Sequence, residues 1–129
     1  MMLTTVTGAG IVITPDALEE VLRRKYGSLH VGRRSPAARG RVNISILAGT
    51  FQPIVTLGDS MTNLAIQGSW EEAAEIAAVV RAAVPTDGPG LVLLADDGSG
   101  FADVPPGATP ESVAAGRKDI SHFPGYTEN

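Results

Sequence analysis

The chain has 129 residues, of which 43% are hydrophobic and 19% charged, and its net charge is −4. This length suits one domain, and the apolar content excludes a wholly disordered chain because it is enough to offset the entropy cost of folding. The absence of cysteine excludes disulfides, zinc–thiolate sites and thiol nucleophiles.

The first predicted helix begins after Thr14. Thr14 is a suitable N-cap, Pro15 fits the first helical position, and Asp16 favours the positive end of the helix dipole. Apolar residues then recur at helical spacing, and Gly27 is the expected C-terminal stop. The pattern therefore predicts an amphipathic helix between Thr14 and Gly27.

The segment 27–41 has no hydrophobic periodicity, contains several glycines and a proline, and is rich in arginine. We interpret it as a long, mobile basic loop, because loops of this length in compact domains are functional or disordered. Seven of the ten basic residues lie between positions 23 and 41, without any acid, whereas the rest of the chain holds 14 acids and 3 bases. Charge is therefore segregated along the sequence, which bears on partners more than on fold.

Three closely spaced strands are predicted after this loop, at 42–46, 53–57 and 62–67. Their short connections require antiparallel hairpins, because a parallel crossover needs about a dozen residues. Near the N-terminus, a short strand at 11–13 and another at 3–7 are further candidates.

The second predicted helix runs from Ser69 to about Val84. Ser69 and Glu72 have the spacing of a capping box. An apolar strand at 91–94, a turn at 97–100 and a short strand at 101–104 follow, and Phe101–Val104 is expected at the periphery of the sheet.

A short helix is expected from Pro110, and residues 116–129 form a polar tail that Phe123 and Tyr126 could attach to the body. The element order α-β-β-β-α-β-β, with this closing helix, predicts an α+β fold in which two main helices pack on an antiparallel sheet of about five strands. We expect residues 1–115 to form a single domain.

Each pattern that could indicate a catalytic or metal-binding site is explained better by an ordinary structural role. The two histidines, His30 and His122, have no partners at metal-ligand spacing and are expected to be exposed. The acidic pair Asp96-Asp97 precedes Gly-Ser-Gly, which is typical of a hairpin turn and lacks the ligand spacing of a calcium loop. We therefore predict no catalytic residue, no metal site and no cofactor.

The basic segment remains the strongest functional signal. Guanidinium groups make bidentate contacts with carboxylates and phosphates, so the predicted partner-binding residues are Arg33, Arg34, Arg39 and Arg41. The leading hypothesis is a small cytoplasmic, non-catalytic protein-binding module, similar in role to an immunity protein, chaperone or adaptor, that binds an acidic or charged protein. No leader or membrane span is expected.

Two alternatives stay open. The arginines could bind nucleic acid, although a whole-chain isoelectric point near 5.0 and the lack of an aromatic residue among them disfavour it. A small enzyme with a site between subunits, near Asp96, His30 or His122, is the second alternative. Homodimerisation through a sheet edge is a further hypothesis.

Overall fold

The computed structural model describes residues 1–5, 13–33, 42–57, 63–84 and 90–123. The helices in these ranges are α1 (Pro15–Tyr26), α2 (Trp70–Arg81), α3 (Pro110–Ala115) and the short 3₁₀ helix η1 (Ile120–His122). The strands are β1 (Met2–Thr5), β2 (Leu29–Arg33), β3 (Val42–Ile46), β4 (Ile54–Leu57), β5 (Leu64–Gln67), β6 (Leu91–Leu94), β7 (Gly100–Val104) and β8 (Lys118–Asp119).

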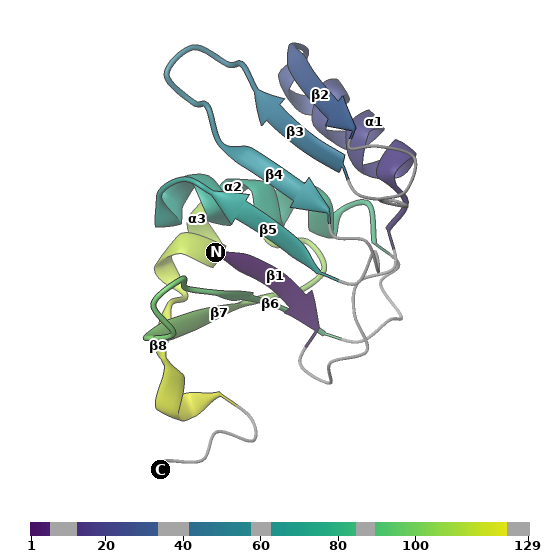
Figure 1. The fold of residues 1–129 in the computed structure, drawn as a ribbon. Helices are drawn as coiled ribbons and strands as arrows, with labels where there is room; N and C mark the ends of the chain where they lie inside the picture. The colour runs from purple at the N-terminus through teal and green to yellow at the C-terminus, as the bar shows by residue number, and fades with distance from the viewer. Residues whose placement is uncertain (6–12, 34–41, 58–62, 85–89, 124–129) are drawn as a thin grey trace.

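The strands form one sheet in the order β2-β3-β4-β5-β1-β6-β7-β8, and every neighbouring pair is antiparallel. The helices α1, α2 and α3 lie on one side of this sheet, with α1 against the β2–β3 end and α2 behind its middle (Figure 1). The predicted α+β fold with an antiparallel sheet is confirmed, and the sheet has more strands than the sequence predicted.

The first strand of the chain lies in the middle of the sheet. Leu3 of β1 stands opposite Leu64 of β5 on one side and Leu93 of β6 on the other. The expectation of a strand within 3–7 is met by Met2–Thr5, and residues 6 and 7 lie outside the described ranges. The second N-terminal strand, expected at 11–13, is not seen at Ile13, and its first two residues also lie outside these ranges.

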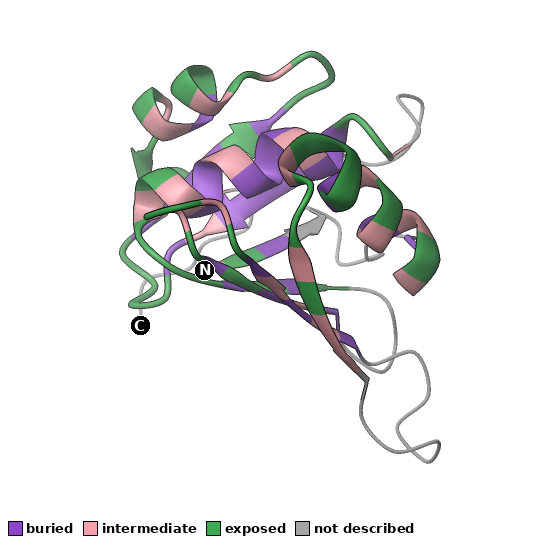
Figure 2. Ribbon diagram, turned by 90° about the horizontal axis from the view of Figure 1, so that it is seen from above, coloured by how far each residue is buried: buried purple, intermediate pink, exposed green. Residues whose placement is uncertain are grey.

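The core lies between the sheet and the helices. Along β3, buried Val42, Ile44 and Ile46 alternate with the half-buried Asn43 and Ser45, because successive side chains of a strand point to opposite faces. Leu18 and Leu22 of α1 contribute fully buried side chains, and α2 buries several alanines against the sheet. Figure 2 shows these buried stretches on α2 and on the strands beside it.

Both main helices begin as predicted. The Thr14 hydroxyl accepts a hydrogen bond from the Ala17 amide at 3.1 Å. Ser69 and Glu72 form a reciprocal capping box, in which the Glu72 amide donates to Ser69 Oγ at 3.2 Å and the Ser69 amide donates to Glu72 Oε1 at 2.8 Å. The end of α2 differs, because the helix stops at Arg81 rather than near Val84.

The prediction of a loop over 27–41 is wrong for its first part. Residues Leu29–Arg33 form β2, which pairs with β3 so that Leu29 stands opposite Ile46 and Val31 opposite Ile44. Gly27, with a φ of 82°, ends α1 and turns the chain back along the sheet. The strand carries only two alternating apolar residues, too few to reveal a strand amid the surrounding glycines and arginines. Positions 34–41 lie outside the described residues.

The predictions for β7 and the C-terminal tail also need correction. Phe101–Val104 belongs to an interior strand, because β8 pairs with the other side of β7. The start of the tail is therefore part of the sheet. Phe123 packs edge-to-face on Phe101 at 5.1 Å between ring centroids, as its aromatic character suggested. Tyr126, the other expected anchor, lies outside the described residues.

Candidate partner-binding site

Of the seven basic residues between positions 23 and 41, the structure describes four, and these lie on two elements. Arg23, Arg24 and Lys25 occupy the last turn of α1. Arg33 ends β2, opposite Val42, on the order of 13 Å along the strand from Leu29. The other predicted contact residues, Arg34, Arg39 and Arg41, lie outside the described residues.

Two of the α1 cations have local acidic partners at the spacing expected for a helix surface. Arg23 pairs with Glu19 at 2.9 Å, and Arg24 pairs with Glu20 at 2.7 Å. Exposed pairs of this kind contribute about 0.3–0.5 kcal/mol each and leave the cations accessible to solvent. Lys25 forms no ion pair with any described residue. Positive charge is therefore available at the C-terminal end of α1.

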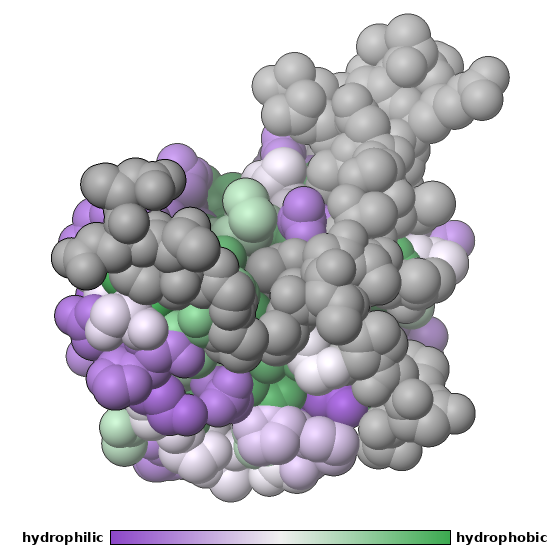
Figure 3. Space-filling view, turned by 90° about the horizontal axis from the view of Figure 1, so that it is seen from below, coloured by the Kyte–Doolittle hydropathy of each residue, from purple (hydrophilic) through white to green (hydrophobic). Residues whose placement is uncertain are grey.

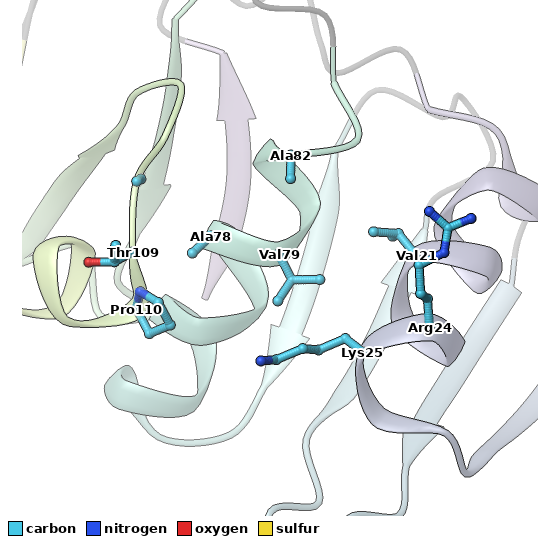
Figure 4. Close-up of a pocket in the computed structure, with 9 residues that line it drawn as sticks. Val21, Arg24, Lys25, Ala78, Val79, Ala82, Thr109 and Pro110 are labelled. Carbon is cyan, nitrogen blue, oxygen red and sulfur yellow. The ribbon is translucent and has the colours of Figure 1, made fainter.

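An open groove of about 420 Å³ lies beside these cations; it runs from α1 across α2 to the start of α3 (Figure 4). Its floor and walls are mainly apolar, and Arg24 and Lys25 stand at its rim. The other lining residues come from three places. They are Val21 of α1; Ala78 and Val79 of α2, with Ala82 just after it; and Ala108, Thr109 and Pro110 at the start of α3. In the close-up, Val21 and Lys25 point from α1 toward Val79.

Local sequence explains why this groove is apolar. Val21 and Lys25 are four residues apart and therefore project from the same face of α1. Where α2 meets the groove, it presents Ala78 and Val79, and Ala82 follows just beyond its C-terminal end, so the side chains on this side are small and apolar. Because small side chains fill little space, they leave a shallow channel where a leucine-rich helix would have closed against its neighbour.

A polar and aromatic contact links the two helices that flank the groove. The Tyr26 hydroxyl, at the end of α1, donates a hydrogen bond of 2.7 Å to Glu75 Oε2 of α2. The Tyr26 ring also stacks on Phe51 at 5.2 Å. Burial, together with the hydrogen bond and the nearby charge of Glu75, raises the pKa of the Tyr26 phenol above its usual value. Tyr26 therefore stays neutral and ties α1 to both α2 and the β3–β4 connection.

Two smaller clefts have a more polar character. One, of about 230 Å³, is lined by Glu71, Glu75 and Glu111 together with Pro110 and Ala114. The other, of about 190 Å³, is lined by Met1, Ala95, Asp96, Asp97 and Arg117. Within the described parts of the chain, no group of three or more His, Cys, Asp or Glu side chains is placed so that it could bind a metal ion.

The second cleft lies beside a tight turn. The Asp97 carboxylate accepts hydrogen bonds from the Ser99 hydroxyl and amide at 2.6 and 2.9 Å, and these bonds lower the pKa of Asp97. Gly98 adopts a φ of 72° within this turn. The predicted hairpin at 97–100 thus explains the acidic pair, and Asp96 itself forms an ion pair with the terminal amine of Met1.

The residues considered for an enzymatic site are distributed over separate elements. His30 is exposed on β2 at one end of the sheet, His122 is exposed in η1 near the other end, and Asp96 follows β6. The exposure of both histidines agrees with the sequence-based expectation. Within one chain, the three side chains do not form a common site.

The groove was not predicted from the sequence. The sequence predicted α2 and its capping box, but it did not indicate which α2 side chains would line a second contact surface. Val79, which is only partly buried, and the exposed Ala82 just beyond the helix were the available signals of such a surface. Its partner surfaces on α1 and at Ala108–Pro110 depend on tertiary arrangement, which local periodicity does not specify.

No helix in the described ranges combines the length and apolar character needed to cross a bilayer. Comparisons of the chain with protein-family models, curated proteins and solved structures gave no match.

Proposed function

We propose that this protein is a non-catalytic partner-binding module that holds a short, acidic amphipathic helix of another protein in the groove between α1 and α2. The observation that carries the proposal is an apolar channel bordered by two cations, Arg24 and Lys25. Amphipathic helices commonly bind by placing their apolar face in such grooves. The proposed ligand therefore has an apolar face that fits the channel and acidic side chains that reach the two cations.

Charge complementarity favours an acidic ligand over a basic or neutral one. Lys25 has no acidic partner among the described residues, so a ligand carboxylate would not have to displace an existing ion pair. Arg24 is exposed while it pairs with Glu20 and can share its remaining donors. Cations on a rim chiefly increase the association rate and select the partner, whereas burial of apolar surface on the floor contributes most of the affinity.

The small side chains of the floor favour a helical ligand. Ala78 and Ala82 lie four residues apart, so they line one face of α2 and its end. Small residues at such a contact allow another helix to approach closely. The Tyr26–Glu75 hydrogen bond holds the flanking helices together, which reduces the reorganisation that binding would require.

The proposal keeps two expectations from the sequence. Arg33, Arg34, Arg39 and Arg41 would contact acidic surface of the same partner outside the groove. The protein would act in the cytoplasm. Neither expectation is needed for the groove itself to bind a helix.

A designed peptide provides the test. A fluorescent peptide of about 15 residues, with leucines at helical spacing on one face and glutamates on the other, should bind in an anisotropy titration. The same peptide with lysines in place of glutamates should bind at least tenfold more weakly because of repulsion at the rim. Val79→Glu should reduce affinity for the acidic peptide at least tenfold, or about 1.4 kcal/mol, since it places a charge in the channel.

The two lysines of the chain provide a matched control. Lys25→Glu should weaken binding about fivefold and reduce its salt dependence, whereas Lys118→Glu, on β8, should leave both unchanged. Bound peptide should also protect Lys25, but not Lys118, from acylation. Equal binding of acidic and basic peptides, or equal effects of the two lysine variants, would contradict the proposal.

A further inference from the structure

A different feature, the outer edge of β2, provides an independent inference about assembly. The Leu47 amide donates to the Ser28 carbonyl at 3.1 Å, and the Ile46 amide donates to the Pro53 carbonyl at 3.1 Å. Bonded and non-bonded pairs alternate along an antiparallel ladder. With the observed β2–β3 register, His30 and Gly32 therefore direct their backbone N–H and C=O groups toward β3. The corresponding groups of Leu29, Val31 and Arg33 point away from the sheet.

No described strand pairs with this outer edge, because β2 is the terminal strand of the sheet order. Seen from above in Figure 2, β2 lies foremost, with no described element in front of it. Natural sheets often protect such edges with proline, a bulge or an inward-pointing charge in mid-strand. Residues 29–33 contain no proline, pair with β3 without a break in register, and have their single charged residue at the end.

The opposite end of the sheet is less suited to strand addition. There, β8 comprises only Lys118 and Asp119. Viewed from below in Figure 3, hydrophilic residues occupy much of the described surface at this end. The β2 edge is longer, and the backbone N–H and C=O groups of three alternate residues point outward from it.

We propose that β2 pairs antiparallel with β2 of a second copy of this chain, giving a symmetric homodimer with a continuous sheet. Placing Val31 opposite Val31 of the second copy also places Leu29 opposite Arg33, and both positions then form bonded pairs. This register uses all six outward backbone N–H groups of the two edges. Shifting it by two residues would leave some of them unpaired, so the symmetric register satisfies the edges best.

Side chains fit the same register. Leu29 and Val31 pack against the core but are only partly buried, because the sheet ends beside them. A second copy would place its own Val31 directly opposite Val31 and diagonally beside Leu29. His30 would face Gly32, where an added Cβ would meet nothing nearer than the Asn43 carbonyl at 3.9 Å. The two Arg33 residues would stand opposite Leu29 rather than each other, which keeps their like charges apart.

Proline at position 31 tests the backbone pairing. Val31→Pro removes an outward N–H that β3 does not use, so the monomer should keep its fold, whereas the edge loses a central donor. Light scattering over a concentration series should give the mass of two chains for the wild-type protein at high concentration and of one chain for Val31→Pro. The control Val31→Thr keeps the N–H and should remain dimeric. Far-ultraviolet circular dichroism checks the fold of each variant.

A cysteine variant tests the register even where proline disturbs folding. The chain has no native cysteine, and directly opposed bonded residues have Cα atoms about 5.5 Å apart, within the range of a disulfide. Mild oxidation should therefore cross-link Val31→Cys into a dimer but leave the exposed control Ser28→Cys largely uncoupled. Wild-type protein of one-chain mass at every concentration, a dimeric Val31→Pro, or equal cross-linking of the two cysteine variants would overturn the inference.

Discussion

Tyr26 is a single residue that links α1 both to α2 and to the β3–β4 connection. Its hydroxyl donates to Glu75, and its ring stacks on Phe51. Tyr26→Phe keeps the ring but leaves the carboxylate without this donor. We expect a loss of about 1–2 kcal/mol in unfolding free energy, measured by urea denaturation at neutral pH. Lys118→Gln, which alters an exposed ion pair on β8, is a control and should change stability by less than about 0.5 kcal/mol.

The same tyrosine should make stability depend on pH in the alkaline range. Folding raises the pKa of the phenol above its ordinary value of 10.0, first through burial and then through Glu75. The folded protein therefore holds this proton more tightly than the unfolded chain does. Its stabilising contribution is complete below pH 10 and is lost as the pH rises further. A denaturation series from pH 8 to pH 11 should show this loss in the wild type and a smaller loss in Tyr26→Phe.

At the element scale, α2 depends on the cap at its first turn. Ser69 and Glu72 satisfy each other's backbone amides, and this arrangement follows directly from their spacing in the sequence. Ser69→Ala removes the hydroxyl acceptor and should cost about 1 kcal/mol of stability, whereas Ser69→Asp should retain most of it. Thermal unfolding of the two variants compares them directly, and equal losses would show that the hydroxyl is not the stabilising group.

Elements with strong local signals were predictable from sequence, and elements defined by pairing were not. Capped, periodic segments gave α1 and α2, and regular alternation gave β3. By contrast, β2 contains two alternating apolar residues and a glycine, and β8 has only two residues. Both exist because an adjacent strand supplies hydrogen-bond partners, and such partners cannot be read from the segment alone. The groove has the same origin, since its walls come from three separate elements.

At the scale of the whole molecule, β1 joins the two halves of the sheet. On one side it pairs with β5, which continues through β4 and β3 to β2, and on the other side it pairs with β6, followed by β7 and β8. Leu3 is fully buried at this junction, whereas Met2 is 42% exposed. We expect Leu3→Ala to cost about 2–5 kcal/mol, and Met2→Ala to cost much less, in denaturant unfolding. Similar losses for the two variants would contradict this account of the junction.

The central place of β1 also affects the order in which the protein can assemble during synthesis. This strand leaves the ribosome before either neighbour, and about 60 further residues must be added before β5 appears and about 90 before β6 is complete. At roughly 5–20 residues per second, the first of these intervals lasts roughly 3–12 s. During this time, β1 has neither of its native neighbours, and the two halves of the sheet cannot join through it before β6 has been synthesised.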